Sequence, residues 1–344
     1  FFEIERILKR KKPSSFILEN VEGLVAHDRV DRKKPIGRTL ETIILTLEKI
    51  GYKVTWKIFN AIDFNVPQNR KRIFIVGNLK EKINLNEIKT SKKNPKFSDI
   101  MESIKVNYQS PFQLKLLKMF KEKELYGKSI KDKRGGSENI HSWDLELKGK
   151  INKIQKRLLS EILTQRRRKI WAQKKKIKWM DGMALTLSDI ESFFCTPDLF
   201  NKSINKSKLK KELDDLVNKG YLTKEYPKES VKKIINNFEV NIRQQDETLS
   251  IGYNIVVGKL SFEISKIIDP NGVTPTLLAT DMNKLQVIDN KKLRKLSVRE
   301  GLRLFGLPEI YNINLPDSKA YNLLGESIVV PIVKKIAEKI FLKN

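Results

Sequence analysis

The first residue whose type and position could support chemistry is an acid at the end of a short apolar run. Glu19 follows the apolar residues 16–18 and comes directly before Asn20 and Val21. If the run is a buried strand, its carboxyl group projects into a cleft at the strand end. Burial raises the pKa of a carboxyl group, and a neutral carboxyl can donate a proton to a ring nitrogen. Glu19 is therefore a candidate acid catalyst, although a solvent-facing Glu at a strand end also fits the tripeptide.

Two arginines at the start of another apolar run could hold a ligand. Arg70 and Arg72 stand beside the apolar residues 73–76, and strand alternation is expected to put both on one face. The planar fork of Arg binds carbonyl oxygens and phosphates in a geometry that Lys cannot offer. We expect the pair to hold a carbonyl oxygen and neighbouring phosphates, with a plain basic strand edge as the alternative.

These side chains fall at the ends of elements that alternate between helix and strand. The expected elements near the start of the chain are helix 1–11, strand 14–19, helix 37–50, strand 53–60 and strand 72–77. The strands are nearly continuous apolar runs, which is typical of a sheet covered on both faces. In such α/β sheets ligands bind beyond the carboxyl ends of strands. Helices at 298–305 and near 327–342 return to a globular pattern at the other end.

Charge and composition indicate a protein that binds a polyanion. The chain has 344 residues and is 40% hydrophobic, which is enough for a large core and about two domains. Its 69 basic against 41 acidic residues give a net charge of +28, which attracts nucleic acid in a salt-sensitive way. A lysine-rich surface without any such partner also fits the excess.

The low numbers of Cys and His and the short apolar runs argue against several other classes of protein. One Cys and two His leave no disulfide framework and too few ligands for a zinc cluster, so no metal site is expected. No apolar run reaches the length of about 20 residues that a membrane helix needs, and the first residues carry no signal pattern. We therefore expect a cytoplasmic protein without membrane contact.

The middle of the chain differs in character from both ends. A long basic helical stretch at 150–178 is followed by an apparent helix at 185–194, a helix at 208–219 and a hairpin at 220–227. This is the order of a winged helix, a common way to place a helix in the major groove, and a plain helical insertion fits equally well. The candidate DNA contacts of the basic stretch are Arg166, Arg167 and Arg168, although a solvated helix face also explains such charges.

Four segments in order resemble motifs of the cytosine-5 DNA methyltransferases. Residues 19–21 resemble the sixth motif of that family, 63–72 its seventh and eighth, 294–309 its ninth and 320–331 its tenth. A long insertion separates the eighth motif from the ninth, where the family carries a variable target-recognition region. The order and number of these matches argue against chance.

The resemblance implies roles for particular residues. Glu19 is expected to activate a cytosine that has been flipped out of double-stranded DNA, while Arg72 and Arg70 hold the base. Gln68 and Thr276 are expected to contact the DNA, Thr276 at the phosphate beside the flipped base. In the ninth motif, the expected interdomain braces between recognition and catalytic domains are Arg299 and Arg303.

The tenth motif implies S-adenosyl-L-methionine as the cofactor, but it departs from the family pattern at one position. Glu326 stands where the family usually has Asn, and an ionised Glu would repel the carboxylate of the cofactor. Gly325 and Ser327 are therefore the expected cofactor contacts.

Two other motifs of the family have no counterpart in this sequence. These are the glycine-rich cofactor loop and the Pro-Cys segment that carries the nucleophile. Cys195 lies in the insertion after a Phe rather than a Pro, which indicates a buried structural Cys. The chain is therefore expected to be inactive without a further part.

These observations combine into one expected architecture. We expect an α/β fold with an incomplete Rossmann-like S-adenosylmethionine-dependent methyltransferase domain and a large inserted target-recognition domain, winged-helix-like or plainly helical in part. The expected bounds are 1–82 for the C-terminal half of the catalytic domain, 83–288 for the recognition domain and 289–344 for the return to the catalytic domain.

The expected function follows in three versions. The first is the C-terminal part of a bacterial cytosine-5 DNA methyltransferase of a restriction–modification system, recorded as a fragment. The alternative is a non-catalytic DNA-binding subunit of a split methyltransferase, in which a second chain supplies the cofactor loop and the nucleophilic Cys. An RNA methyltransferase of similar fold is the third.

Overall fold

The computed structural model describes residues 1–31, 33–91, 93–132, 138–194, 206–235, 238–256 and 262–342, and Cys195 lies outside them. The chain divides into two compact units, which are described separately: unit 1 contains residues 1–108 and 267–344, and unit 2 contains residues 109–266. The expected domain bounds differ from these. Residues 83–108 and 267–288 fold with unit 1, because side chains such as Phe97 and Val287 are buried in its core.

A three-stranded sheet positions the candidate residues of unit 1. Its strands are β1 (Ser15–Val21), β2 (Lys53–Asn60) and β3 (Lys71–Asn78), in the order β1-β3-β2, and β3 is antiparallel to both neighbours. The carboxyl ends of β1 and β2 therefore lie at the same edge of the sheet as the start of β3.

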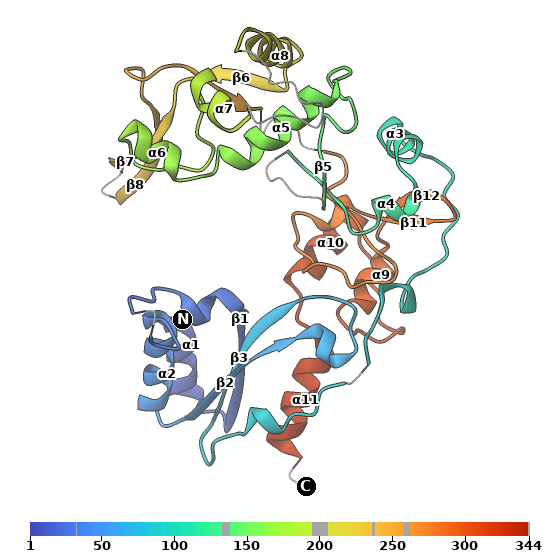
Figure 1. Cartoon of the computed structure of the whole chain (residues 1–344). Helices are drawn as coiled ribbons and strands as arrows, with labels where there is room; N and C mark the ends of the chain where they lie inside the picture. The colour runs from blue at the N-terminus through green and yellow to red at the C-terminus, as the bar shows by residue number, and fades with distance from the viewer. Residues whose placement is uncertain are drawn as a thin grey trace. The chain divides into compact units, whose positions relative to one another are not determined.

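Helices cover both faces of this sheet, as the apolar runs predict. The helices α1 (Phe2–Lys11) and α2 (Arg38–Lys49) lie on one side and α11 (Val330–Phe341) on the other (Figure 1). Alternation along β3 sends Ile73 and Ile75 into the core with α1 and α2, and Phe74 and Val76 into the core with α11. The five elements expected between residues 1 and 80 are confirmed.

The rest of unit 1 consists of a hairpin, helices and short 3₁₀ turns. The hairpin pairs β11 (Leu285–Asp289) with β12 (Lys292–Lys295) in antiparallel register. The helices are α9 (Val298–Arg303) and α10 (Asp317–Glu326), and the 3₁₀ helices are η1 (Glu22–Ala26), η2 (Ala61–Phe64), η3 (Leu85–Glu87), η4 (Phe97–Asp99) and η5 (Met282–Lys284). The helices expected at 298–305 and near 327–342 are confirmed by α9 and α11.

Unit 2 is mainly helical with short strands. Its helices are α3 (Pro111–Met119), α4 (Glu122–Leu125), α5 (Lys153–Gln165), α6 (Ile170–Lys175), α7 (Leu187–Phe194) and α8 (Lys206–Asn218). Its strands are β4 (Ser129–Ile130), β5 (Asn139–Ile140), β6 (Leu222–Glu225), β7 (Lys228–Ile235), β8 (Phe238–Gln245) and β9 (Gly252–Ile255), while β10 (Lys266–Ile267) stands at the boundary with unit 1. The basic stretch is two helices rather than one.

The larger part of unit 2 has the connectivity of a winged helix. After α5, Leu185 forms a β-bridge with Tyr253, then α7 and α8 follow, and β6 pairs antiparallel with β9. The strands β7 and β8 form a separate hairpin between β6 and β9, in the place of the wing (Figure 1). The expected hairpin at 220–227 is wrong, because β6 pairs with β9 and the hairpin begins only at Lys228.

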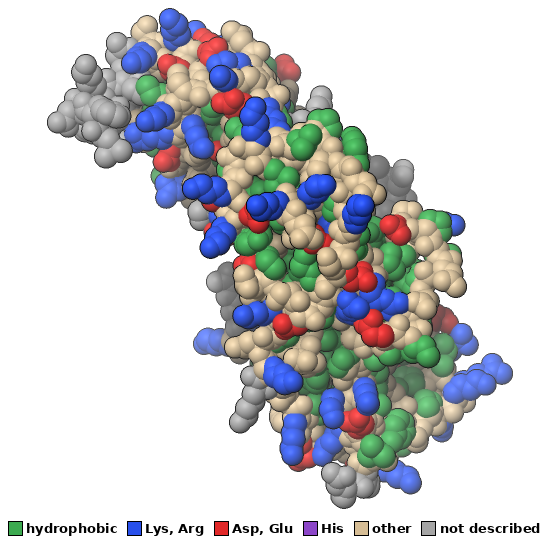
Figure 2. All heavy atoms as spheres, turned by 90° about the vertical axis from the view of Figure 1, so that its right-hand side faces the viewer, with side chains coloured by type: hydrophobic (Ala, Val, Ile, Leu, Met, Phe, Trp, Pro, Cys, Tyr) green, Lys and Arg blue, Asp and Glu red, His purple; other side chains and the backbone are tan. Residues whose placement is uncertain are grey.

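Neither hydropathy nor charge singles out a surface by itself. Among the described residues, no helix combines the length and apolar character needed to cross a membrane. Figure 2 shows one face of the molecule, on which basic side chains lie scattered among acidic and apolar ones.

Candidate active site

Glu19 and Arg72 form an ion pair on one face of the sheet in unit 1. Val21 is the register partner of Arg72, and Glu19 lies two residues before Val21, so the two charged side chains are diagonal neighbours across β1 and β3. Arg72 Nε is 2.9 Å from Glu19 Oε1, and the side chains keep 14% and 20% of their exposure. The structure therefore differs from the expected desolvated carboxyl: Glu19 is partly exposed and already holds a cation.

A pocket of about 420 Å³ lies beside this pair. Its lining includes Arg72, Asn69, Lys71 and Thr276, together with the residues that follow β1. The Thr276 hydroxyl donates to the backbone oxygen of Asn69 at 2.7 Å, which joins two segments 207 residues apart. The structure thus brings together the sixth-motif strand, the segment before β3 and Thr276, as the resemblance implies.

Gln68 has a different position from the one expected of a DNA contact. Its side chain is fully buried, its Nε2 donates to the oxygen of Leu304, and its Oε1 accepts from the backbone N–H of Leu277. Both ends of the amide are therefore used inside the protein. The expectation that Gln68 touches DNA is wrong for this structure, because a side chain without exposed atoms cannot reach a duplex.

Arg70 is also buried, and it does not share a face with Arg72. It lies before the first residue of β3, so strand alternation does not apply to it. Its Nη1 donates to Leu277 O at 3.1 Å and its Nη2 to Ser327 O at 2.9 Å. Burial and the nearby charge of Arg72 lower the pKa of Arg70 to about 10. In the structure its guanidinium ties the active-site segment to the chain after residue 270.

The loop that carries these residues is fixed by Asn60 at the end of β2. Asn60 Oδ1 accepts from the backbone N–H of Arg70 at 3.1 Å, and Asn60 Nδ2 donates to Asn69 Oδ1 at 3.0 Å. Asn69 N–H in turn donates to Thr274 O at 2.8 Å. This network holds the pocket wall in one conformation, and the sequence offered no signal for the role of Asn60.

Gly325 and Ser327 lie at the end of α10. A Cβ at Gly325 would stand 2.1 Å from the backbone nitrogen of Ala279, so only glycine permits this approach. The Ser327 hydroxyl donates to Leu323 O at 2.8 Å, and Ser327 O accepts from Arg70. The Glu326 side chain between them is exposed.

The sequence resembles those of known DNA methylases. The family model described as C-5 cytosine-specific DNA methylase matches residues 1–342. The chain belongs to this family. It is 51% identical to the Type II methyltransferase M.NlaIV of Neisseria lactamica over 99% of this chain and 76% of that protein. It is 34% identical to M.BanI of Aneurinibacillus aneurinilyticus over 100% of this chain and 74% of that protein.

A solved structure also matches most of the chain. It is the crystal structure of the Schizosaccharomyces pombe Dnmt2 methyltransferase, with 12% identity, a TM-score of 0.43 and coverage of 98% of this chain and 70% of that one. Methylases of this C-5 family use S-adenosyl-L-methionine as the methyl donor. The α/β fold expected from the sequence is the fold that the structure has.

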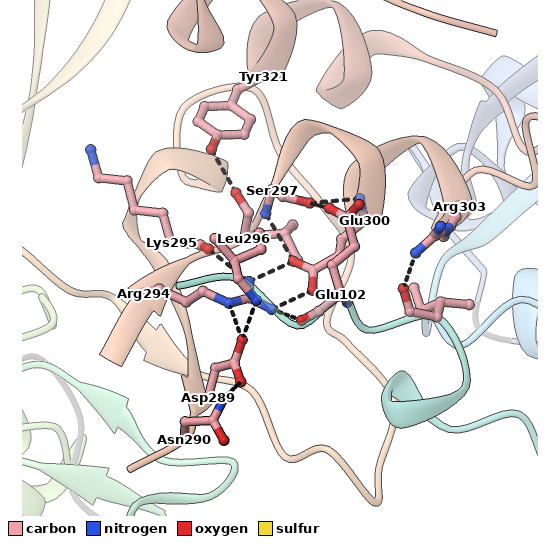
Figure 3. Close-up of polar contacts among 12 residues, drawn as sticks. Glu102, Asp289, Asn290, Arg294, Lys295, Leu296, Ser297, Glu300, Arg303 and Tyr321 are labelled. Atoms are coloured by element: carbon pink, nitrogen blue, oxygen red, sulfur yellow. Dashed lines mark hydrogen bonds and ion pairs between the residues drawn. The ribbon is translucent and has the colours of Figure 1, made fainter. Parts of the chain in front are cut away.

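Sequence reasoning missed the most heavily bonded arginine of unit 1. Arg294 on β12 is 6% exposed and ion-pairs with Asp289 at 2.9 Å and with Glu300 at 2.7 Å (Figure 3). It also donates to the backbone oxygens of Glu102 and Lys295. A single guanidinium thus joins the β11–β12 hairpin, the start of α9 and the segment around residue 102. An arginine in the ninth motif was visible in the sequence, but its burial was not.

Arg299 and Arg303, the expected interdomain braces, have described bonds inside unit 1. Arg299 donates to the backbone oxygens of Glu309 and Tyr311. Arg303 holds the Glu309 carboxylate at 2.8 Å and donates to Ile100 O. These bonds assign both side chains to the packing around α9, and their expected contact with the recognition domain stays a prediction.

The three arginines of the basic stretch in unit 2 have three different environments. Arg167 pairs with Asp181 at 3.0 Å, and Arg168 contacts Gln165 Oε1 at 3.3 Å. Arg166 is 7% exposed, and its buried Nε has no hydrogen-bond partner among the described residues. The expected run of equivalent DNA contacts is therefore not a uniform helix face.

Proposed function

We propose that this chain acts in a Type II restriction–modification system and methylates carbon 5 of a cytosine flipped out of duplex DNA. The observation that carries the proposal is the Glu19–Arg72 pair beside a pocket lined by Arg72 and Thr276, in a chain of the C-5 family. The relatives M.NlaIV and M.BanI are named as Type II methyltransferases. The excess of basic residues supports a nucleic-acid substrate.

In this proposal Glu19 and Arg72 bind neighbouring atoms on the same edge of the base. Glu19 contacts ring nitrogen 3 as an acid or hydrogen-bond donor, which makes carbon 6 more electrophilic. Arg72 binds the carbonyl oxygen next to that nitrogen, and its bond to Glu19 keeps both groups oriented before the base enters. The Thr276 hydroxyl has one hydrogen, which it redirects from Asn69 O to a phosphate oxygen beside the flipped base.

Arg70 is assigned a positioning role rather than a contact with the base. Its guanidinium binds backbone oxygens of two segments that follow unit 2 in the sequence, and its backbone N–H is held by Asn60. Shortening Arg70 would leave buried carbonyl groups unpaired and release the wall that carries Thr276.

The cofactor supplies an electrophilic methyl group, and this chain offers only part of a site for it. We propose that Gly325 and Ser327 form one wall, with glycine chosen for the close approach of Ala279. The exposed Glu326 carboxylate has the same charge as the carboxylate of S-adenosyl-L-methionine, so this position does not fit that group. We therefore expect the described residues of this wall to contact the cofactor by close packing rather than by charge.

We further propose that residues outside this sequence supply the cofactor loop and the nucleophile. The sequence has no Pro-Cys pair, and its one Cys follows Phe194. In addition, β1 pairs with β3 on one side and with no described strand on the other. An open strand edge next to the active site is a suitable place for the missing strand to pair.

The test joins this chain to the part of M.NlaIV that the chain does not match. The fusion is expected to transfer labelled methyl groups from S-adenosyl-L-methionine to carbon 5 of cytosine in duplex DNA. Glu19→Gln in the fusion is expected to lower the rate by about 10²-fold or more, since general acid–base groups typically contribute that much. Transfer at the parental rate by the Glu19→Gln fusion would refute the assigned role.

The same two protein parts also test the alternative, in which this chain is a non-catalytic DNA-binding subunit that works with a second chain. If the M.NlaIV part added as a separate chain restores as much transfer as the fusion does, the split arrangement is supported. If only the fusion is active, the single-chain version is supported. Faster methylation of transfer RNA than of duplex DNA by the fusion would favour the third version.

A further inference from the structure

The hairpin of β7 and β8 is an isolated two-stranded ribbon with two different faces. The strands pair over eight residues each, from Lys228 opposite Gln245 to Ile235 opposite Phe238, and with no other described strand. Residues directly opposite one another project from the same face of an antiparallel pair. We name one face the donor face, and its described members are Lys228, Ser230, Lys232, Ile234, Glu239, Asn241, Arg243 and Gln245.

The opposite face has a different composition. Val231 faces Ile242 and Lys233 faces Val240, so apolar side chains make up its middle. The donor face instead presents mainly side-chain types that bind base edges in DNA, namely Arg, Lys, Asn, Gln and Ser. The exceptions lie at its tip, where Ile234 faces Glu239 and the Glu239 carboxylate pairs with Lys232 at 2.8 Å. Asn241, Arg243 and Gln245 are exposed. The register of the pairing determines which side chains lie on the donor face, because a shift of one strand by one residue would move its side chains to the opposite face.

The shape of the ribbon suits a duplex. Eight residues per strand give a length of about 27 Å, and the major groove is wide enough to admit a two-stranded ribbon. A ribbon of this kind has little stability by itself, because it buries few side chains. Binding in a DNA groove would bury side chains of the ribbon that are exposed to solvent in the protein alone.

A pocket at the root of the donor face provides a second, independent observation. Its volume is about 400 Å³, and its lining includes Lys228 and Arg243 of the ribbon together with Arg166. Arg166 is more than nine-tenths buried, and its buried Nε has no hydrogen-bond partner among the described residues. Gly182, at φ +91°, leaves the space for it, since a Cβ there would stand 2.4 Å from Arg166 Nη2.

The acids of this pocket already have partners. Asp181 holds Arg167 at 3.0 Å, and Glu225 holds Lys228 at 2.6 Å and Asn254 Nδ2 at 2.6 Å. Burial lowers the pKa of Arg166, and the nearby charges of Asp181 and Glu225 act in the opposite direction. A buried guanidinium N–H without a hydrogen-bond partner is costly, and an anion entering the pocket would relieve that cost.

The helix α8, which would be the reading helix of a winged helix, is less suited to DNA. Two of its lysines are engaged within the protein, Lys210 with Asp214 and Lys206 with Glu191. The hydrogen bond from Lys210 lowers the pKa of Asp214 to about 2, so this carboxylate is ionised at neutral pH. Asp214 also pairs with Lys224 at 2.8 Å, so both lysines are neutralised by a carboxylate of the protein rather than by a phosphate.

We propose that the β7–β8 ribbon, rather than α8, enters the major groove of the target duplex. Asn241 and Arg243 of the donor face contact base edges there, and the pocket around Arg166 receives a backbone phosphate. This inference rests on the proposed action on duplex DNA. It assigns sequence discrimination to residues 228–245, which lie within the segment 83–288 expected from the sequence to form the recognition domain.

The test uses the whole chain and a pair of charge-matched variants. Arg243→Gln and Lys233→Gln each remove one positive charge from an exposed position of the same ribbon, but on opposite faces. A selection from randomised duplexes at low salt with the parent chain first defines its preferred sequence. Both variants are then titrated with that duplex and with a scrambled one, over a range of salt concentrations.

The donor-face variant is expected to lose affinity for the preferred duplex by about tenfold or more, with a smaller loss on the scrambled one, because one bidentate base contact discriminates to that extent. Lys233→Gln is expected to keep the parental discrimination. Asn241→Ala should behave as Arg243→Gln does without a change of charge. Tryptophan fluorescence on heating checks that unit 2, which holds Trp143 and Trp171 in its core, stays folded.

Three results would contradict the proposal. Two of them concern the ribbon alone, and the third also concerns the proposed function. Equal discrimination by the two charge variants, or no loss in either, would overturn the role of the ribbon alone. Enrichment of no sequence by a parent chain that binds DNA would do the same. Failure of the parent chain to bind any duplex at low salt would overturn the proposed function as well.

Discussion

The buried Arg294 network allows a quantitative prediction about the stability of unit 1. Replacing Arg294 by Met keeps most of the volume but leaves Glu300, which has no exposed surface, and Asp289 without their cation. Removing one partner of a buried ion pair typically costs about 3–5 kcal/mol. Because the whole free energy of unfolding of a domain is about 5–15 kcal/mol, the variant should be severely destabilised.

Urea denaturation at pH 7, followed by circular dichroism, measures this loss, and hydrogen exchange assigns it to unit 1. The matched control is Lys295→Met, which removes the same charge from the next residue of β12 but at an exposed position. The control should change the free energy of unfolding by less than about 0.5 kcal/mol. The double variant Arg294→Met, Glu300→Gln should lose less than the sum of the single losses, because the two side chains share one network. Equal losses for Arg294→Met and Lys295→Met would refute the reasoning.

Two further predictions concern one position in each unit. Gly325→Ala should lower the free energy of unfolding by about 1–3 kcal/mol in denaturant titrations, because its Cβ would stand 2.1 Å from Ala279 N, whereas Gly23→Ala, with nothing within 4 Å, should stay near the parental value. In unit 2, burial acts to raise the pKa of Asp144, but hydrogen bonds, chiefly from His141, lower it to about 2. Its folded-state pKa is depressed, so its stabilisation of about 2 kcal/mol is present above about pH 4 and lost as the pH falls towards 2. Asp144→Asn should therefore be less stable than the parent at pH 7, and a difference that stays constant down to pH 2 would contradict this.

The elements of the first eighty residues could be predicted because their patterns are local. The apolar run before Gly77 makes both faces of β3 buried, and the period of residues 37–50 makes α2 amphipathic. The pairing of Glu19 with Arg72 follows from strand alternation once the register is known, and the register depends on contacts that the sequence does not display.

The errors at the candidate site concern residues just outside regular elements. Arg70 and Gln68 precede β3, so their side chains follow the path of the loop rather than the alternation of the strand. Their partners, Leu277 and Leu304, are more than 200 residues away. Only the tertiary structure shows that these polar side chains are buried. The ribbon, by contrast, had a visible signal in the alternation of Phe238–Gln245 that was not used.

The arrangement of unit 1 also has a consequence for folding during synthesis. The three described strands of its sheet are translated by residue 78, but the side chains that cover the second face, such as Ile332 and Ile336, follow only after unit 2. The buried side chain of Gln68 can form its hydrogen bond to Leu304 O only after another 236 residues have been translated. Unit 2 is continuous in sequence and can fold first, so it shortens the effective loop whose closure unit 1 requires. We expect nascent chains that stall before α11 to expose Phe74 and Val76 and to depend on chaperones, whereas unit 2 would already be protected from protease.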